Sequence, residues 1–93
     1  MSDMNIAGNL MKRKRFVNYN LIGHEKHITA LDVKDGMILS GSKDNTVKFW
    51  DIKRKKVMTF TDHMNWINQA MIWDEENGIT AACDKSIRLW NFK

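Results

Sequence analysis

The sequence predicts an all-β chain that contains two copies of one antiparallel unit of strands. Short runs rich in Ile, Val, Leu, Phe and Trp alternate with turn residues along most of its 93 residues. The segment 23–51, GHEKHITALDVKDGMILSGSKDNTVKFWD, also matches a second segment downstream. The spacing of about 40 residues is typical of repeat arrays in which each copy is one unit of strands.

The predicted strands follow one another closely and are separated by turns such as Lys34-Asp35-Gly36 and Lys43-Asp44-Asn45. They comprise residues 16–22, 28–33, 37–42, 46–52, 57–60, 66–73, 79–82 and 86–92. The strand over 46–52 carries apolar residues on both faces, with Val47 and Phe49 on one side and Trp50 on the other. A strand buried on both faces needs neighbours above and below it, which predicts stacked sheets.

The second copy aligns with the first without a gap through the third strand of the unit. Placing Asp44 on Asp84 brings residues 44–51, DNTVKFWD, onto residues 84–91, DKSIRLWN. One inserted residue in the preceding turn then brings His24 onto His63. The recurrence of His, Asp, Trp and a hydroxyl at matching positions makes a chance repeat a poor explanation.

These motifs resemble the WD-repeat family of β-propellers from about residue 16 onward. The first copy has both signature pairs, Gly23-His24 and Trp50-Asp51, whereas the second has Asp62-His63 and Trp90-Asn91. The resemblance implies two four-stranded antiparallel blades that form a partial ring, with strand order d-abc-d-abc. Repeat 1 would span about 23–60 and repeat 2 about 61–93, with residues 16–22 as an outer strand of a preceding blade.

Two blades cannot close a ring, because propellers have about 4 to 8 of them. An open stack would expose apolar faces and strand edges. We therefore expect a homo-oligomer of two to four chains, or a complex with a different chain, to complete the propeller. A non-functional fragment of a longer propeller is the remaining alternative.

The resemblance also implies a structural hydrogen-bond network in each repeat. The loop histidine, a hydroxyl, the turn aspartate and the tryptophan would form it, because these groups can donate and accept in sequence. The residues at the matching positions are His24, Ser40, Asp44 and Trp50, and then His63, Thr80, Asp84 and Trp90.

The same comparison implies a protein-binding face beside the histidine loops and the aspartate turns. The residues at those positions are Glu25, His27, Lys43, Met64, Trp66 and Cys83. Trp66 is the strongest candidate, because exposed tryptophan is a common anchor in interfaces. Packing of Trp66 on the neighbouring loop is the equally weighted alternative.

No catalytic, metal or cofactor site is expected. Ser40, His24 and Asp44 have the residue types of a hydrolase triad, but their recurrence in the second copy favours a structural role. No nucleophile elbow surrounds the hydroxyl. The spacings of His24, His27, His63 and Cys83 match no zinc pattern.

The remaining features concern the N-terminus and the compartment. Residues 1–15 are expected to be a disordered basic arm, in which Lys12-Arg13-Lys14-Arg15 forms a nuclear-import or phosphate-binding candidate. The single cysteine fits a reducing compartment. The chain has no run of 18 apolar residues and no secretory signal pattern, so an intracellular place, cytoplasmic or nuclear and away from membranes, is expected.

Together, these observations predict a non-enzymatic scaffold for protein–protein interaction within a larger complex. The rival hypothesis is a nucleic-acid-associated scaffold, such as a ribonucleoprotein component, that binds phosphate through residues 12–15 and 53–56. A steep dependence of binding on salt would distinguish the second hypothesis from the first.

Overall fold

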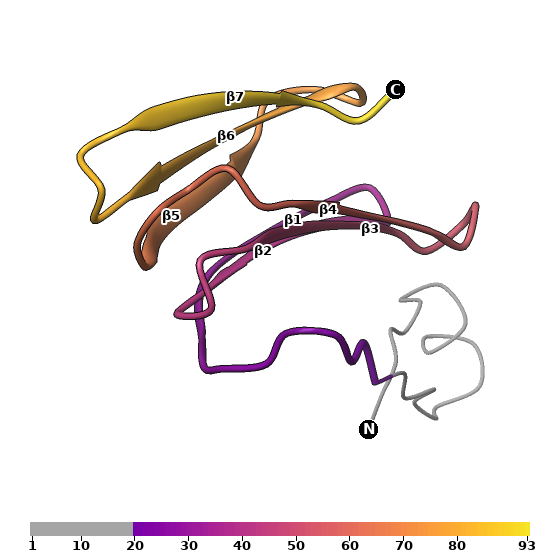
Figure 1. Ribbon diagram of the computed structural model, residues 1–93. Helices are drawn as coiled ribbons and strands as arrows, with labels where there is room; N and C mark the ends of the chain where they lie inside the picture. Colours follow the sequence, from indigo (N-terminus) through magenta and orange to yellow (C-terminus); the bar gives the residue numbers. More distant parts are fainter. Residues whose placement is uncertain (1–19) are drawn as a thin grey trace.

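The computed structural model describes residues 20–93 and places them in two stacked antiparallel sheets (Figure 1). The first sheet has the order β1-β2-β3-β4 and the second the order β5-β6-β7. The strands are β1 (Ile28–Lys34), β2 (Met37–Ser42), β3 (Val47–Asp51), β4 (Lys56–Phe60), β5 (Ile67–Ile72), β6 (Asn77–Ala82) and β7 (Ile87–Asn91). The predicted all-β architecture of two blades in a partial ring is thus confirmed.

The turns between strands explain why each sheet forms locally. Asp35 and Gly36 both have positive φ, 49° and 80°, in the two-residue connection between β1 and β2. This backbone matches the twist of the two flanking strands, so it favours a tight hairpin. Asn45 and Lys85, with φ of 72° and 71°, occupy matching places in the β2–β3 and β6–β7 turns.

The two sheets repeat each other in register as well as in strand order. Leu39 lies opposite Phe49 in the first sheet, and Ile79 lies opposite Leu89 in the second. Each sheet also has an irregularity near the start of its first strand, after Ile28 and after Ile67. The alignment of the two sequence copies therefore corresponds to a repeat in three dimensions.

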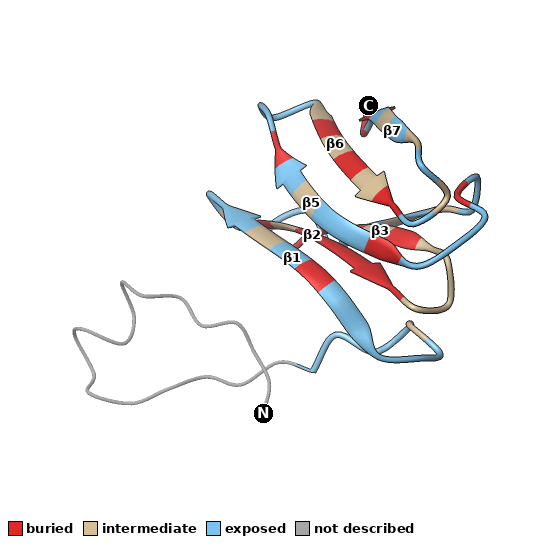
Figure 2. Ribbon diagram, turned by 90° about the vertical axis from the view of Figure 1, so that its left-hand side faces the viewer, coloured by how far each residue is buried: buried red, intermediate tan, exposed pale blue. Residues whose placement is uncertain are grey.

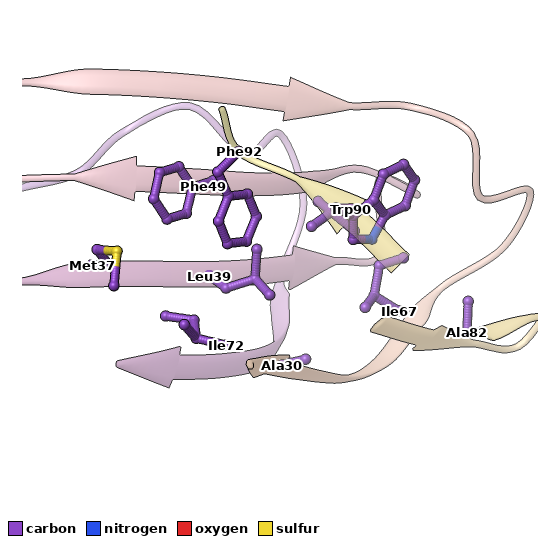
Figure 3. Close-up of a cluster of buried hydrophobic side chains, with 10 residues drawn as sticks. Ala30, Met37, Leu39, Phe49, Ile67, Ile72, Ala82, Trp90 and Phe92 are labelled. Carbon is purple, nitrogen blue, oxygen red and sulfur yellow. The ribbon is translucent and has the colours of Figure 1, made fainter. Parts of the chain in front are cut away.

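The hydrophobic core lies between the two sheets, where side chains of β2 and β3 meet side chains of the second blade (Figure 3). Leu39 and Ile67 are fully buried there. The rings of Phe49 and Phe92 stack with centroids 3.9 Å apart and planes 8° from parallel. Burying a large apolar side chain contributes about 1.5–3 kcal/mol, so this interface is the main source of cohesion between the blades.

A glycine sets the distance between the blades. A Cβ built on Gly41 of β2 would lie 2.2 Å from Cγ2 of Ile67 and 2.5 Å from its Cβ. Both atoms are close to the backbone of β5, so they cannot move away freely. The absence of a side chain at Gly41 thus allows β2 and β5 to approach closely.

The first sheet also holds the second through polar contacts. The Thr29 hydroxyl donates to the carbonyl of Ile67, and the Asp32 carboxylate accepts from the amide of Ile72 at 2.6 Å. These bonds join β1 to β5, so the stack combines apolar packing with hydrogen bonds from side chain to backbone.

The outer strand expected over residues 16–22 differs from what the structure shows. Residues 20–22 have no strand structure, and residues 16–19 lie outside the described residues. Residues 20–22 run along the first sheet on the side away from the second sheet (Figure 1). A strand needs a neighbouring strand to pair with, and the part of the chain that the structure describes supplies none on that side.

The predicted strand over residues 37–42 matches β2, and the other predicted boundaries lie within two residues of the observed ones. The expected basic arm over residues 1–15, including Lys12 to Arg15, lies outside the described residues. Within residues 20–93, the structure contains no helix of the length and hydrophobicity needed to cross a membrane.

Candidate partner-binding face

A chain of hydrogen bonds crosses the first blade from its entry loop to its third strand. Nε2 of His24 lies 2.7 Å from the Ser40 hydroxyl, and the Trp50 indole N–H donates to the same hydroxyl at 2.9 Å. Nδ1 of His24 lies 3.3 Å from the carboxylate of Asp44. The structure therefore brings all four residues of the expected network into contact.

The second blade contains the same arrangement. Nε2 of His63 lies 2.8 Å from the Thr80 hydroxyl, which accepts the Trp90 indole N–H at 2.7 Å. Nδ1 of His63 lies 3.0 Å from the carboxylate of Asp84. Thr80 takes the place that Ser40 has in the first blade, and the chain of hydrogen bonds is preserved because only the hydroxyl takes part in it.

Two further hydroxyls belong to these networks and were not identified from the sequence. The Thr46 hydroxyl lies 2.5 Å from Asp44 and 3.0 Å from His24. The Ser86 hydroxyl has the same two contacts, at 2.5 Å from Asp84 and 3.1 Å from His63. A hydroxyl two residues after the aspartate in both copies was the signal that could have revealed them.

Hydrogen bonds determine the charge state of both turn aspartates. Burial of Asp44 acts to raise its pKa, but donors from the Thr46 side chain, the amides of Glu25 and Thr46, and His24 outweigh it. The net effect holds the pKa of Asp44 below its ordinary value. The Ser86 hydroxyl and then the Met64 amide lower the pKa of Asp84 in the same direction.

These networks fix two loops at one end of each blade. Asp44 joins its own turn to the amide of Glu25 at 2.9 Å, and the Lys43 amide donates to the His27 carbonyl at 2.9 Å. In the second blade, Asp84 accepts from the amide of Met64 at 2.9 Å. The entry loop and the aspartate turn of each blade are therefore held side by side.

The residues expected to bind a partner lie on these loops, and two of them meet across the blades. The Lys43 ammonium of the first blade lies 4.3 Å from the ring centroid of Trp66 in the second. The Trp66 carbonyl accepts the Cys83 amide at 2.8 Å, yet the Trp66 side chain remains 48 % exposed. Trp66 thus packs against Lys43 of the neighbouring blade and also presents an exposed surface, and its role in binding a partner stays a prediction.

The other expected residues lie on the same entry loops and aspartate turns. Met64 is 78 % exposed, and Cys83 is exposed with its thiol 3.2 Å from the Asn68 side chain. Glu25 and His27 line an open hollow beside Lys43. We call the surface formed by these residues the loop face; its members are Glu25, His27, Lys43, Met64, Trp66 and Cys83.

The chemistry available to the other candidate groups is limited. The Ser40 side chain is 3 % exposed and its oxygen already contacts Trp50 and His24. His24 and His63 belong to separate blades and separate networks. Among residues 20–93, no three His, Cys, Asp or Glu side chains come together as a metal site would require.

Comparison with known proteins agrees with the repeat architecture. The family model described as "WD40: WD domain, G-beta repeat" matches residues 16–51 and 54–91. The structure is similar to the crystal structure of the WD40 β-propeller domain of Doa1, with a TM-score of 0.70 and 31 % sequence identity. The match covers 83 % of this chain and 26 % of that one. It also matches the computationally designed Ika4 protein at a TM-score of 0.68 and 28 % identity, over 78 % of this chain and 46 % of that one.

The curated relatives are much longer proteins. The chain is 32 % identical over 74 residues to the ribosome biogenesis protein WDR12 homolog of Anopheles gambiae, covering 74 % of this chain and 17 % of the relative. It is 39 % identical over 66 residues to the pre-mRNA-processing factor 19 of Caenorhabditis elegans, covering 69 % of this chain and 13 % of the relative. The chain thus spans less than a fifth of the length of these relatives. Because the family model matches both repeats, and these form two propeller blades, the chain belongs to the WD40 repeat family.

Proposed function

We propose that this protein is a non-enzymatic scaffold that binds a protein partner through the loop face. The observation that carries the proposal is Trp66, whose side chain is half exposed and lies against the Lys43 ammonium of the other blade, while its backbone carbonyl accepts the Cys83 amide. An aromatic side chain on a loop that is held in this way loses little conformational freedom on binding. Trp66 is therefore suited to serve as an anchor for a partner.

The surroundings of Trp66 suggest what the partner offers. Met64 adds a flexible apolar surface, which adapts to differently shaped side chains. Lys43 adds a positive charge beside the indole ring. A partner segment with an apolar anchor followed by a carboxylate would complement both features.

The relatives support a role in a larger assembly. Two of them are named for ribosome biogenesis and for pre-mRNA processing, and both processes concern RNA-containing machinery. An intracellular location, nuclear or cytoplasmic, would suit such a role. The exposed thiol of Cys83 is compatible with a reducing compartment.

A selection of displayed random peptides on the immobilised chain would test the proposal. We expect enriched peptides to combine an aromatic or large aliphatic residue with an acidic one. Trp66→Ala should weaken their binding by about 10- to 100-fold, as expected for an anchor residue. Trp73→Ala is the matched control, because Trp73 is also exposed, at 57 %, but lies outside the loop face. Equal losses in the two variants, or no loss in Trp66→Ala, would contradict the proposal.

The second candidate function is phosphate binding by the basic turn between β3 and β4. Two of its residues already have internal contacts, because Arg54 pairs with Asp51 at 2.9 Å and Lys56 donates to the Phe92 carbonyl at 2.9 Å. Lys53 and Lys55 remain as the candidate phosphate contacts. Titration of a labelled single-stranded RNA at two salt concentrations would separate the candidates. Tight binding that falls steeply with salt would favour the nucleic-acid role.

Two blades are only part of a ring. We propose that these two blades act within a completed propeller.

A further inference from the structure

The hydroxyl groups of residues 20–93 differ in whether another protein can reach them. Ser40, Ser42 and Thr80 are 3 %, 0 % and 1 % exposed. They belong to β2 and β6, whose buried stretches are red in Figure 2. These three hydroxyls are therefore closed to modification in the folded chain.

Three more accessible hydroxyls already make structural contacts. The hydroxyls of Thr46 and Ser86 each lie 2.5 Å from the carboxylate of the turn aspartate in their blade. The Thr29 hydroxyl donates to the carbonyl of Ile67 in the second blade. A negatively charged group on any of the three would break its contact, and at Thr46 or Ser86 it would also meet a carboxylate of like charge.

Thr59 has a different environment. It lies on β4, the outer strand of the first sheet, and it is exposed. Lys48 of β3 lies opposite Thr59, and its ammonium donates to the Thr59 hydroxyl at 2.8 Å. Lys48 belongs to none of the ion pairs that residues 20–93 form. Thr59 thus combines an accessible hydroxyl with a neighbouring cation that has no carboxylate partner among the described residues.

The residues that precede Thr59 are strongly basic. The run 54–56, Arg-Lys-Lys, lies five to three positions before it. In a strand each residue advances by about 3.3 Å, so the α-carbons of Lys56 and Thr59 lie about 10 Å apart. An enzyme that holds this run by charge must present carboxylates at that distance from the group that acts on the hydroxyl.

The basic side chains keep donors for such carboxylates. Arg54 and both lysines are exposed, the side chain of Arg54 at 74 %. Arg54 pairs with Asp51 through Nη1, and Nζ of Lys56 donates to the Phe92 carbonyl. A guanidinium has five donors and an ammonium has three, so each side chain can bind a further acceptor.

The position of β4 makes the segment approachable. Among residues 20–93, β4 pairs with β3 alone, so one edge of the strand has no neighbour in this part of the chain (Figure 1). Phe60 stacks on Trp90 of the second blade, and neighbouring residues of a strand point to opposite faces, so Thr59 points away from that blade. An enzyme can therefore reach Thr59 without separating the two blades.

We propose that Thr59 is a phosphorylation site for a protein kinase that selects basic residues before its target. The Thr59 oxygen attacks the γ-phosphorus of a nucleoside triphosphate bound by the kinase. The bond from this phosphorus to the oxygen that bridges it to the β-phosphate breaks, and the nucleoside diphosphate leaves. The hydroxyl proton passes to a base of the kinase. This inference goes beyond the scaffold role, because it makes the chain a substrate for a second protein.

The structure also indicates what receives the new charge. Phosphothreonine carries a charge of about −1.5 to −2 at pH 7 and three acceptor oxygens. Lys48, whose ammonium already donates to the Thr59 oxygen, is placed to donate to the phosphate. Phosphorylation therefore converts a hydrogen bond between β3 and β4 into an ion pair.

Treatment of the full 93-residue chain with the catalytic subunit of cyclic-AMP-dependent protein kinase and ATP tests the site. Peptide mapping by mass spectrometry should locate a phosphate on Thr59, and Thr59→Val should abolish it. Thr61→Val is the matched control, because Thr61 is also exposed but has Met58 three positions before it. A phosphate on Thr61 in place of Thr59, or none on either, would overturn the proposal.

Charge variants test how the kinase recognises the segment. Lys55→Gln with Lys56→Gln should slow phosphorylation of Thr59 by about tenfold or more, the scale on which a lost charge-assisted contact weakens binding. Lys26→Gln with Lys85→Gln removes the same charge from the loops of the two blades and should leave the rate unchanged. Equal losses in the two double variants would refute recognition of the basic run.

Phosphorus magnetic resonance of the phosphorylated chain tests the contact with Lys48. Because a nearby cation favours the dianion, the second pKa of the phosphate should be lower in the parent chain than in Lys48→Met. Methionine retains an unbranched side chain and removes the charge. The same phosphate pKa in both chains would show that Lys48 does not receive the phosphate.

The scaffold role and the phosphorylation site fail separately in these experiments. Phosphorylation of Thr59 in a chain that selects no peptides would preserve the site and refute binding through Trp66. Peptide binding through Trp66 in a chain that the kinase leaves unmodified would preserve the scaffold and refute the site.

Discussion

Replacing Trp90 by alanine tests whether the hydrogen-bonded tryptophan holds the second blade. The side chain is 7 % exposed, stacks on Phe60 of the first blade at 4.6 Å and donates to Thr80 at 2.7 Å. It thus joins a strand to its own sheet and a blade to its neighbour. Both connections would be lost in Trp90→Ala.

The expected loss follows from these contacts. Truncating a buried tryptophan to alanine costs about 3–5 kcal/mol through lost burial and the cavity that remains. Trp90→Phe retains a ring against Phe60 and loses mainly the indole donor and some volume, which costs about 1–2 kcal/mol. Since a small domain has only about 5–10 kcal/mol of stability in total, Trp90→Ala should leave little of it.

Urea unfolding followed by far-ultraviolet circular dichroism would measure these losses, at one fixed chain concentration because association adds to apparent stability. Trp73→Ala, a change of the same chemistry at an exposed position, should shift the free energy of unfolding by less than about 1 kcal/mol. The reasoning would be refuted by a Trp90→Ala variant as stable as Trp73→Ala.

Other predictions concern the blade interface and the acid response. Gly41→Ala should lower the free energy of unfolding by about 1–3 kcal/mol, because the new Cβ overlaps Ile67; an unchanged urea midpoint would show that the sheets can separate freely. Because the folded pKa values of Asp44 and Asp84 lie below the unfolded value of about 3.9, the unfolded state binds more protons in acid. Stability should therefore be fully present above about pH 4 and fall as the pH drops toward the folded pKa values. Thr46→Val removes a donor to Asp44, so it should reduce stability by about 1 kcal/mol at neutral pH and make the acid dependence shallower, as measured by melting temperature against pH.

Much of the fold could be predicted from the sequence, because each blade is specified by local signals. Turn residues such as Asp35-Gly36 favour a hairpin by their backbone conformation, and alternating apolar residues fix which face of a strand is buried. The exception is the segment 20–22, whose apolar residues Leu21 and Ile22 suggested a strand. Among the described residues no strand lies beside this segment to pair with it, so its apolar residues alone do not make it a strand.

The loop face was harder to predict than the strands. The alignment placed Lys43 on the aspartate turn of the first copy and Trp66 on the entry loop of the second, but their contact depends on how one blade lies against the next. The Thr46 and Ser86 hydroxyls were visible in the repeat, yet their contact with the histidines follows from the turn geometry. The four-residue network within each copy could thus be predicted from the family resemblance, whereas the contacts of Thr46 and Ser86 and the contacts across copies required the structure.

The closure of each polar network within a single blade has a consequence for how such chains can change over time. His63, Thr80, Asp84 and Trp90 all belong to one repeat, so a duplicated repeat brings a complete network with it. The apolar face is instead shared with whatever lies next to it. After duplication, residues of the apolar face can change to suit a new neighbouring blade while the internal network stays intact. The blade is therefore the unit that is duplicated, and its apolar face is the part in which the copies come to differ.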